Sequence, residues 1–194
     1  VVRADILLYC PYIDADAVGE QQDMGNTATI PRYTSGRVIA VGQSASSTLG
    51  QFTFSYTNQD GVAGRTSQNH FTFVVAGGGQ VVASSVQSAA SYHPYLALQA
   101  GDSGVKSIES VTFTAGGGGL MALVIVQPLL ECFLTQEAKR GTTDSFGACN
   151  GFASVIHHRP RQIKDGAVIN LFAAGHAGSL ASSILAGVLE TTWN

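Results

Sequence analysis

The sequence predicts an all-β fold, an antiparallel β-sandwich of the jelly-roll type. Short runs of β-branched, aromatic and other apolar residues recur along the chain, and clusters of Gly, Asn, Asp and Ser separate them, as in strands joined by turns. Long helical periodicity and alternation of helices with strands are nearly absent, which disfavours a parallel α/β fold. We expect roughly nine to eleven strands, a number that a jelly-roll accommodates in one domain.

The N-terminal part is expected to be a strand followed by an arm. The strand covers residues 6–10, and Pro11 is expected to end it. The polar stretch over residues 14–31 is interpreted as a long surface arm or loop. Its acidic residues are Asp14, Asp16, Glu20 and Asp23. We therefore expect an N-terminal strand and extended arm over residues 1–34 and the sandwich domain over residues 35–194.

The central part contains a series of strands separated by turns. The expected strands span residues 37–43, 51–57, 69–75, 80–87, 95–99 and 105–114. In the second of them Phe52, Phe54 and Tyr56 share one face, and Thr53 and Ser55 share the other. Asp60-Gly61 is a pair that tight hairpins favour. In the last strand the alternation slips between Val105 and Ile108, which indicates a β-bulge.

The C-terminal third is expected to contain further strands and one short helix. A four-glycine turn at residues 116–119 precedes the apolar strand 120–126. Residues 131–140 are the best helix candidate, although an exposed strand or loop also fits them. The remaining strands are expected at residues 152–158, 167–173 and 184–193.

Two apolar stretches fit strands better than membrane spans. Residues 120–130 are shorter than the roughly 20 apolar residues of a spanning helix, and they include Gln127 and Pro128. Residues 166–189 lack charged side chains but contain Asn170, several serines and several glycines. The first residues lack the basic and apolar segments of a signal peptide, so none is expected there. We expect no membrane partner.

Charge and cysteine content exclude further classes of protein. Charged residues make up 12% of the 194 residues, against roughly 25% in an ordinary soluble domain. The net charge is −3, whereas a nucleic-acid binder normally has a basic excess, so we expect no nucleic-acid partner. No C-x-x-C motif is present, so buried, inert thiols are expected. The cysteines are Cys10, Cys132 and Cys149.

Two groups of residues contain potential metal ligands, but neither has the pattern that a metal site requires. In the acidic stretch, Val18 lies where a calcium loop of the EF-hand type needs a third oxygen ligand. His157 and His158 are adjacent, and neighbouring residues of one strand point to opposite faces. The other histidines are scattered at His70, His93 and His176. We expect a solvated acidic loop and a basic contact patch around Arg159 rather than metal ligands.

No motif supports catalysis or cofactor binding. Ser103 lies in Gly-Asp-Ser-Gly, the string around the nucleophile of chymotrypsin-like proteases, but the matching histidine context is missing and a turn is expected. The glycine runs 77–79 and 116–119 do not match a phosphate-binding loop and are interpreted as flexible hairpin tips. The aromatics of strands 51–57 and 69–75 have only Arg65 near them, so we assign them to the core. The prediction is that the protein is not an enzyme, with no catalytic, cofactor-binding or metal-binding residue and no cofactor.

Four segments between residues 55 and 129 carry a resemblance to a known class of protein. They read SYTNQDGVAGRT (55–66), LQAGDSGV (98–105), IESVTF (108–113) and GGLMALVIVQPL (118–129). In this order, over residues 37–130, the chain resembles virion structural proteins of tailed bacteriophages. The resemblance implies a particle component, either a capsid decoration or cement protein or a part of the neck or tail. It implies localisation in the virion and supplies no site residues.

The composition agrees with such a role. Faces that are polar but uncharged can be buried between subunits without the cost of desolvating charges. The leading hypothesis is therefore a non-enzymatic virion structural protein whose partners are copies of itself, as a trimer, and major capsid or neck and tail proteins. One alternative is a receptor- or carbohydrate-binding β-sandwich with Tyr92, Tyr95 and Trp193 as candidate exposed aromatics. The other is a depolymerase or peptidase, which needs a convergent set of groups that the sequence does not display.

Overall fold

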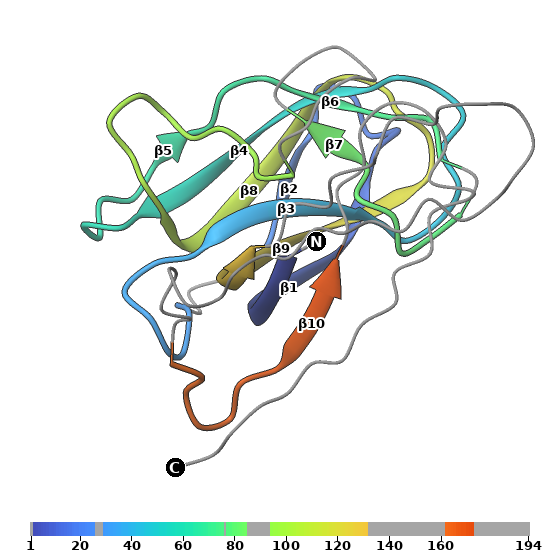
Figure 1. Ribbon diagram of the computed structural model, residues 1–194. Helices are drawn as coiled ribbons and strands as arrows, with labels where there is room; N and C mark the ends of the chain where they lie inside the picture. Colours follow the sequence, from blue (N-terminus) through green and yellow to red (C-terminus); the bar gives the residue numbers. More distant parts are fainter. Residues whose placement is uncertain (1, 26–28, 76, 85–93, 132–161, 173–194) are drawn as a thin grey trace, which may run out of the picture.

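The described part of the chain is all-β and folds into two antiparallel sheets (Figure 1). The computed structural model describes residues 2–25, 29–75, 77–84, 94–131 and 162–172, in which no helix occurs. The strands are β1 (Val2–Asp14), β2 (Gln21–Asp23), β3 (Arg37–Gly42), β4 (Gln51–Asn58), β5 (Arg65–Thr66), β6 (His70–Thr72), β7 (Ala83–Ser84), β8 (Val105–Ala115), β9 (Leu120–Glu131) and β10 (Ile169–Phe172). Among these described residues there is also no helix that could cross a membrane.

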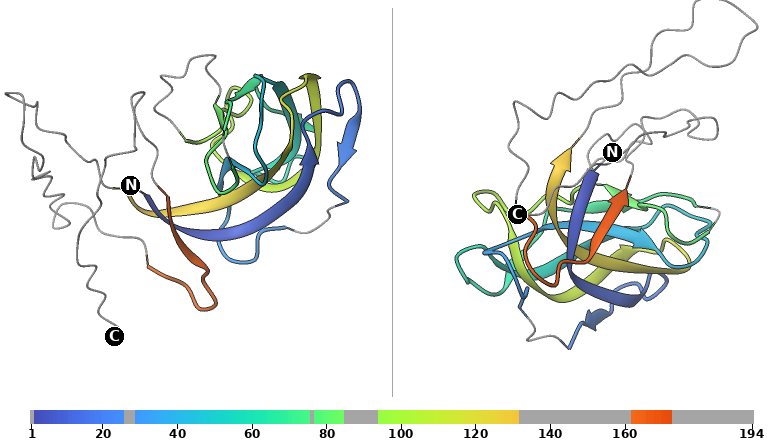
Figure 2. Two further views of the ribbon diagram at one scale, coloured as in Figure 1. Left: turned by 90° about the vertical axis from the view of Figure 1, so that its right-hand side faces the viewer. Right: turned by 60° about the horizontal axis from the view of Figure 1, so that its bottom comes forward.

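The two sheets curl toward each other as a half-barrel (Figure 2). The first sheet has the order β10-β1-β9-β3 and the second the order β2-β8-β4-β6-β7, with β5 paired to β4. Isolated bridges join Gly36, just before β3, to Val105 of β8, and Val41 of β3 to Val81, just before β7, so this segment contacts the second sheet at two places. The all-β, antiparallel part of the prediction is confirmed.

The core lies between the two sheets. β4 alternates as predicted, and Phe52, Phe54 and Tyr56 are at most 1% exposed. Their partners from β9 are Met121, Leu123 and Ile125. The intervening β9 residues are also buried, in a smaller cluster on the other face of the first sheet, and they are Ala122, Val124 and Val126. The apolar run of β9 therefore reflects burial on both faces, as in an inner strand.

The slip of alternation predicted between Val105 and Ile108 is confirmed by a bulge at Lys106, and β8 has a further bulge at Glu109. Ser55 pairs with Ser110 but Tyr56 pairs with Ile108, so Glu109 is the extra residue. A second shift falls between the partners of Thr57 and Asn58. A bulge re-aims the side chain of the extra residue, and Glu109 consequently reaches the outer face of the second sheet.

The extended N-terminal arm is not confirmed. Residues 2–14 form β1, an inner strand of the first sheet that pairs with both β9 and β10. The prediction that Pro11 ends this strand is wrong. The register shifts between Cys10 and Ile13, and this bulge accommodates a residue that cannot donate a ladder hydrogen bond.

The four-glycine turn at 116–119 is not a flexible hairpin tip, because it links β8 of one sheet to β9 of the other. It is closely packed: a Cβ on Gly117 would lie 2.7 Å from Thr72 Oγ1. The run at 77–79 does lie between paired strands, β6 and β7.

Several expected strands are shorter in the structure or are not strands. Of residues 69–75 only His70–Thr72 form a strand. Of residues 80–87 and 167–173 the structure describes those up to 84 and 172, and their strands are Ala83–Ser84 and Ile169–Phe172. Residues 95–99 form no strand but bond as a loop, with the Leu96 N–H donating to the Val38 carbonyl at 2.8 Å. Of the expected helix at 131–140, Glu131 belongs to β9 and the remaining residues lie outside the described part of the chain, as do the expected strands at 152–158 and 184–193.

Candidate functional site

The Gly-Asp-Ser-Gly string forms the predicted turn, at the end of the second sheet where β8 begins. The N–H groups of Ser103 and Gly104 donate to Gln59 Oε1 at 3.0 and 3.2 Å. His70 lies at the other end of β4, where it pairs with Phe52, whereas Asn58 pairs with Val105. Six residues of extended strand span about 20 Å. The one histidine that the structure describes is therefore far from Ser103.

His70 belongs to the aromatic core. Its side chain is fully buried, and its ring lies 5.3 Å from that of Phe52 and 5.5 Å from that of Phe54. Burial lowers the pKa of His70 to about 4, so the imidazole is neutral at physiological pH. A neutral ring between two phenylalanines is a packing element rather than a general base in contact with substrate.

Asp102, next to Ser103, is the centre of a cluster that we name the Asp102 clasp. The clasp comprises Asp102, Tyr56, Asn58 and Arg65. The Tyr56 hydroxyl donates to Asp102 Oδ2 at 2.6 Å, and Asn58 Nδ2 donates to Oδ1 at 2.9 Å. Arg65 donates through Nε at 2.9 Å and through Nη2 at 3.3 Å. The clasp fastens β4 and β5 to the turn before β8.

The electrostatics of the clasp keep Asp102 ionised. The Arg65 guanidinium, with the Tyr56 hydroxyl and Asn58, lowers the pKa of Asp102 to about 2. Burial, followed by the bond to Asp102, raises the pKa of Tyr56 to about 12. The Tyr56 oxygen in turn accepts the Gln99 N–H at 2.9 Å. The polar groups of the clasp form hydrogen bonds with one another and with the backbone at Gln99, which is typical of a structural cluster.

Asp102→Asn is expected to make the free energy of unfolding less dependent on acid pH. A carboxyl whose pKa falls on folding contributes stability above its unfolded pKa near 4, and this contribution is lost as pH falls through the folded value near 2. The variant should be less stable than the parent at pH 7, and the difference should shrink between pH 4 and pH 2. Urea denaturation at several pH values measures this, with Asp60→Asn on an exposed turn as the control. A constant difference would contradict it.

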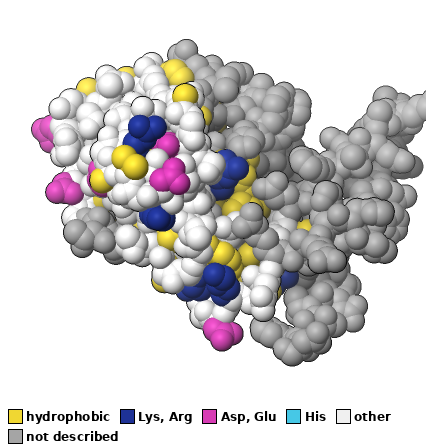
Figure 3. Space-filling view, turned by 90° about the vertical axis from the view of Figure 1, so that its left-hand side faces the viewer, with side chains coloured by type: hydrophobic (Ala, Val, Ile, Leu, Met, Phe, Trp, Pro, Cys, Tyr) yellow, Lys and Arg dark blue, Asp and Glu magenta, His cyan; other side chains and the backbone are white. Residues whose placement is uncertain are grey.

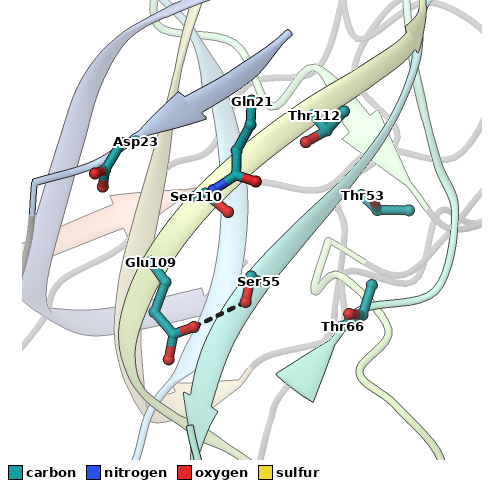
Figure 4. A pocket seen from close by; sticks show the side chains of 8 residues that line it. All are labelled: Gln21, Asp23, Thr53, Ser55, Thr66, Glu109, Ser110 and Thr112. Atoms are coloured by element: carbon teal, nitrogen blue, oxygen red, sulfur yellow. Dashed lines mark hydrogen bonds between the residues drawn. The ribbon is translucent and has the colours of Figure 1, made fainter. Parts of the chain in front are cut away.

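The outer face of the second sheet carries a polar hollow of about 380 Å³. We name this surface the hydroxyl face, and Figure 4 shows its side chains: Gln21, Asp23, Thr53, Ser55, Thr66, Glu109, Ser110 and Thr112. Register places them in two rows across the strands. One row is Asp23, Ser110, Ser55 and Thr66. The other is Gln21, Thr112 and Thr53. The sheet therefore presents a broad array of hydrogen-bonding groups, of which all but Asp23 and Glu109 are uncharged.

Glu109 is one of the two carboxylates of the hydroxyl face, with Asp23, and its oxygens accept hydrogen bonds from within the chain. The hydroxyls of Ser55 and Thr57 donate to it at 2.8 and 2.9 Å, and the Gly64 N–H donates at 3.2 Å. Burial pushes the pKa of Glu109 upward, but these three donors outweigh it and the pKa is lowered. Glu109 consequently remains ionised and oriented at neutral pH.

The acidic stretch does not gather its carboxylates into a cation site. Asp14 Oδ1 accepts the Asp16 N–H at 2.9 Å, and Asp23 Oδ1 accepts the Gly25 N–H at 2.8 Å. Among the described residues no three His, Cys, Asp or Glu side chains lie close enough to hold a metal ion. The carboxylates of Asp14 and Asp23 therefore stabilise local turns by accepting backbone hydrogen bonds.

The other candidates divide between the core and the undescribed segments. Tyr95 is 8% exposed and packs edge-on against Phe172, so it is not the exposed aromatic that the carbohydrate-binding alternative requires. Cys10 is buried in the core, as predicted. Outside the described residues lie Tyr92, His93, Cys132, Cys149, His157, His158, Arg159, His176 and Trp193.

Sequence reasoning missed two features of this site. The predicted outward positions of Thr53 and Ser55 are two of the eight residues of the hydroxyl face, but the sequence suggested an arm where β2 forms and so did not add Gln21 and Asp23. The clasp was missed because Asp102 and Arg65 are 37 positions apart. The only signal was one acidic and one basic side chain, Asp102 in a turn and Arg65 in β5, and many such pairs exist in any chain.

Comparisons with protein-family models, with curated proteins and with solved structures give no significant match.

Proposed function

We propose that the protein is a non-enzymatic structural protein of a virus particle, a capsid decoration protein that stabilises the particle through contacts between subunits. In this proposal its fold is a jelly-roll-like sandwich and it acts as a trimer in the virion. The virion class comes from the resemblance of residues 37–130 to tailed-phage structural proteins. The hydroxyl face is the observation that carries the mode of action.

The hydroxyl face suits burial against a second protein surface. Hydroxyl and amide groups can replace their hydrogen bonds to water by hydrogen bonds to a partner protein at small cost in free energy. Desolvating an unpaired charge costs several kcal/mol, which is on the order of the whole binding free energy of a weak contact. Only Asp23 and Glu109 are charged on this face, and Glu109 already holds three donors. Contacts of this kind are individually weak, but repetition over a shell makes them effective through avidity.

The surface of the described part also fits this role. The view in Figure 3 is largely uncharged, with small groups of basic and acidic side chains. The described groups whose pKa values shift most are His70, Tyr56 and Asp102, which belong to the core and the clasp. These groups pack in the core or bond within the clasp, which supports a structural rather than a catalytic role for the protein.

The proposal predicts a discrete trimer and binding to the particle. Light scattering of the purified protein at neutral pH should give three times the chain mass of 20.1 kDa. The protein should co-sediment with undecorated shells of the particle whose genome encodes it. A monomer that fails to bind shells would contradict the proposal. Electron microscopy of labelled protein would distinguish the capsid from the neck or tail, the alternative position.

Thr112→Lys tests the hydroxyl face itself. An ammonium between Gln21 and Thr53 must be desolvated in any contact, so shell binding should weaken at least about tenfold, or ~1.4 kcal/mol. The thermal midpoint should change little, because Thr112 is half-buried at the sheet surface and surface substitutions shift stability by only about ±0.5 kcal/mol. Gln80→Lys adds the same charge on an exposed loop and should bind normally. Equal binding by both variants would exclude this face as the contact.

A further inference from the structure

A second hollow, of about 300 Å³, lies where the chain passes from the first sheet to the second. It is lined by Tyr9, Pro11 and Tyr12 of β1 and by Gln22, Asp23 and Met24 from β2 and the residue after it. Tyr9 is 50% exposed and Tyr12 is 75% exposed. These are the exposed aromatics that a carbohydrate-binding protein needs, at a place other than the one the sequence suggested.

The backbone at Tyr12 is held in a conformation that tyrosine rarely adopts. Its φ is 61°, and it is the one non-glycine residue with positive φ in the described part of the chain. It lies in the bulge between Cys10 and Ile13, at a kind of position where glycine is usual. Gln43 Oε1 accepts the Tyr12 N–H at 2.6 Å and supports this conformation. A strained residue with an exposed ring indicates a function for that ring.

The polar groups beside the two rings are fixed. Gln22 Oε1 accepts the Asp14 N–H and Gln22 Nε2 donates to the Asp14 carbonyl, both at 2.7 Å, which ties β2 to the end of β1. Asp23 is exposed, and one of its oxygens is oriented by the Gly25 N–H at 2.8 Å. The hollow thus combines two aromatic rings with a preoriented carboxylate.

We propose that this hollow binds a neutral saccharide, with Tyr9 and Tyr12 contacting the sugar ring and Asp23 accepting hydrogen bonds from its hydroxyls. A pyranose has an apolar C–H face and a polar rim, which match the apolar body and polar tip of tyrosine. A carboxylate accepts two hydroxyl donors at once. Asp14 and Asp23 repel uronic and sialic acids, so charge favours neutral sugars. The site is argued independently of the particle role, and Asp23 lies on the border between this hollow and the hydroxyl face.

Saturation-transfer NMR of the full chain tests the proposal with three neutral probes: maltotetraose, cellotetraose and chitotetraose. We expect transfer to at least one of them, and none to a polysialic acid fragment. Tyr9→Ala should weaken binding at least tenfold. Tyr12→Gly should do the same while its thermal midpoint stays equal to or above that of the parent, because glycine relieves the positive φ. Val74→Ala removes another exposed apolar side chain, 59% exposed, and should bind normally.

Several outcomes would overturn the proposal. These are no transfer to any of the three neutral probes, binding that survives both tyrosine variants, or a proline-rich peptide that binds these tyrosines while the sugars do not. Light scattering of Tyr9→Ala gives a further test. If this variant loses the oligomeric state of the parent, the two tyrosines form a contact between copies, and the saccharide assignment is wrong.

Discussion

Asp5→Ala is expected to lower the free energy of unfolding by about 3–5 kcal/mol, the usual cost of removing one partner of a buried ion pair. The Asp5 side chain is fully buried. Its oxygens accept Arg32 Nε at 2.8 Å and Arg32 Nη2 at 2.7 Å, and Oδ1 also accepts the Val168 N–H at 2.8 Å. Without the carboxylate, a guanidinium only 16% exposed and a backbone N–H lose their acceptor.

The effect reaches three parts of the chain at once. Asp5 is on β1, Arg32 is on the segment before β3, and Val168 precedes β10. Arg32 Nη2 also donates to the Ile6 carbonyl at 3.0 Å, and the bond to Asp5 raises the pKa of Arg32. We therefore expect the variant to lose protection of the Val168 amide as well as global stability.

Urea denaturation and hydrogen exchange measure these two effects. Asp165→Ala, on an exposed turn, is the control and should stay within about 0.5 kcal/mol of the parent. The double variant Asp5→Ala/Arg32→Met should be less destabilised than the sum of the single variants, because no guanidinium is then left unpaired. A loss below about 1 kcal/mol in Asp5→Ala would show that the ion pair contributes little.

Gly119→Ala is expected to destabilise the protein by about 2–5 kcal/mol. Its φ is 75°, and a side chain in the left-handed conformation costs roughly 1–2 kcal/mol. The added Cβ would also collide with the Ala45 carbonyl oxygen and lie 2.6 Å from Ser44 Oγ. Overpacking of this kind costs about 1–3 kcal/mol more.

Gly64→Ala is the matched control for this variant. Gly64 has a similar φ of 69°, but a Cβ there would meet no atom within 4 Å. It should therefore cost only the conformational term of about 1–2 kcal/mol. Urea denaturation of both variants separates strain from collision, and equal losses would refute the close packing of the turn at 116–119.

The sequence by itself determined the strand character of the chain and the faces of its clearest strands. In β4 the alternation of Phe52, Thr53, Phe54 and Ser55 reports which side faces the core, because side chains alternate across a strand. The slipped alternation after Val105 located the bulged region of β8 for the same reason. These signals are local, so a single sequence contains them.

Only the tertiary structure decided which strands and side chains meet. β1 continues through Pro11 because a bulge absorbs the missing N–H, although proline by itself indicates a strand end. The turn at 116–119 looked like a hairpin tip, yet it crosses between sheets. Asp5 and Val168, 163 positions apart, are neighbours only after the sheets have formed. Such contacts depend on the chain topology, which cannot be predicted from residue type and local spacing alone.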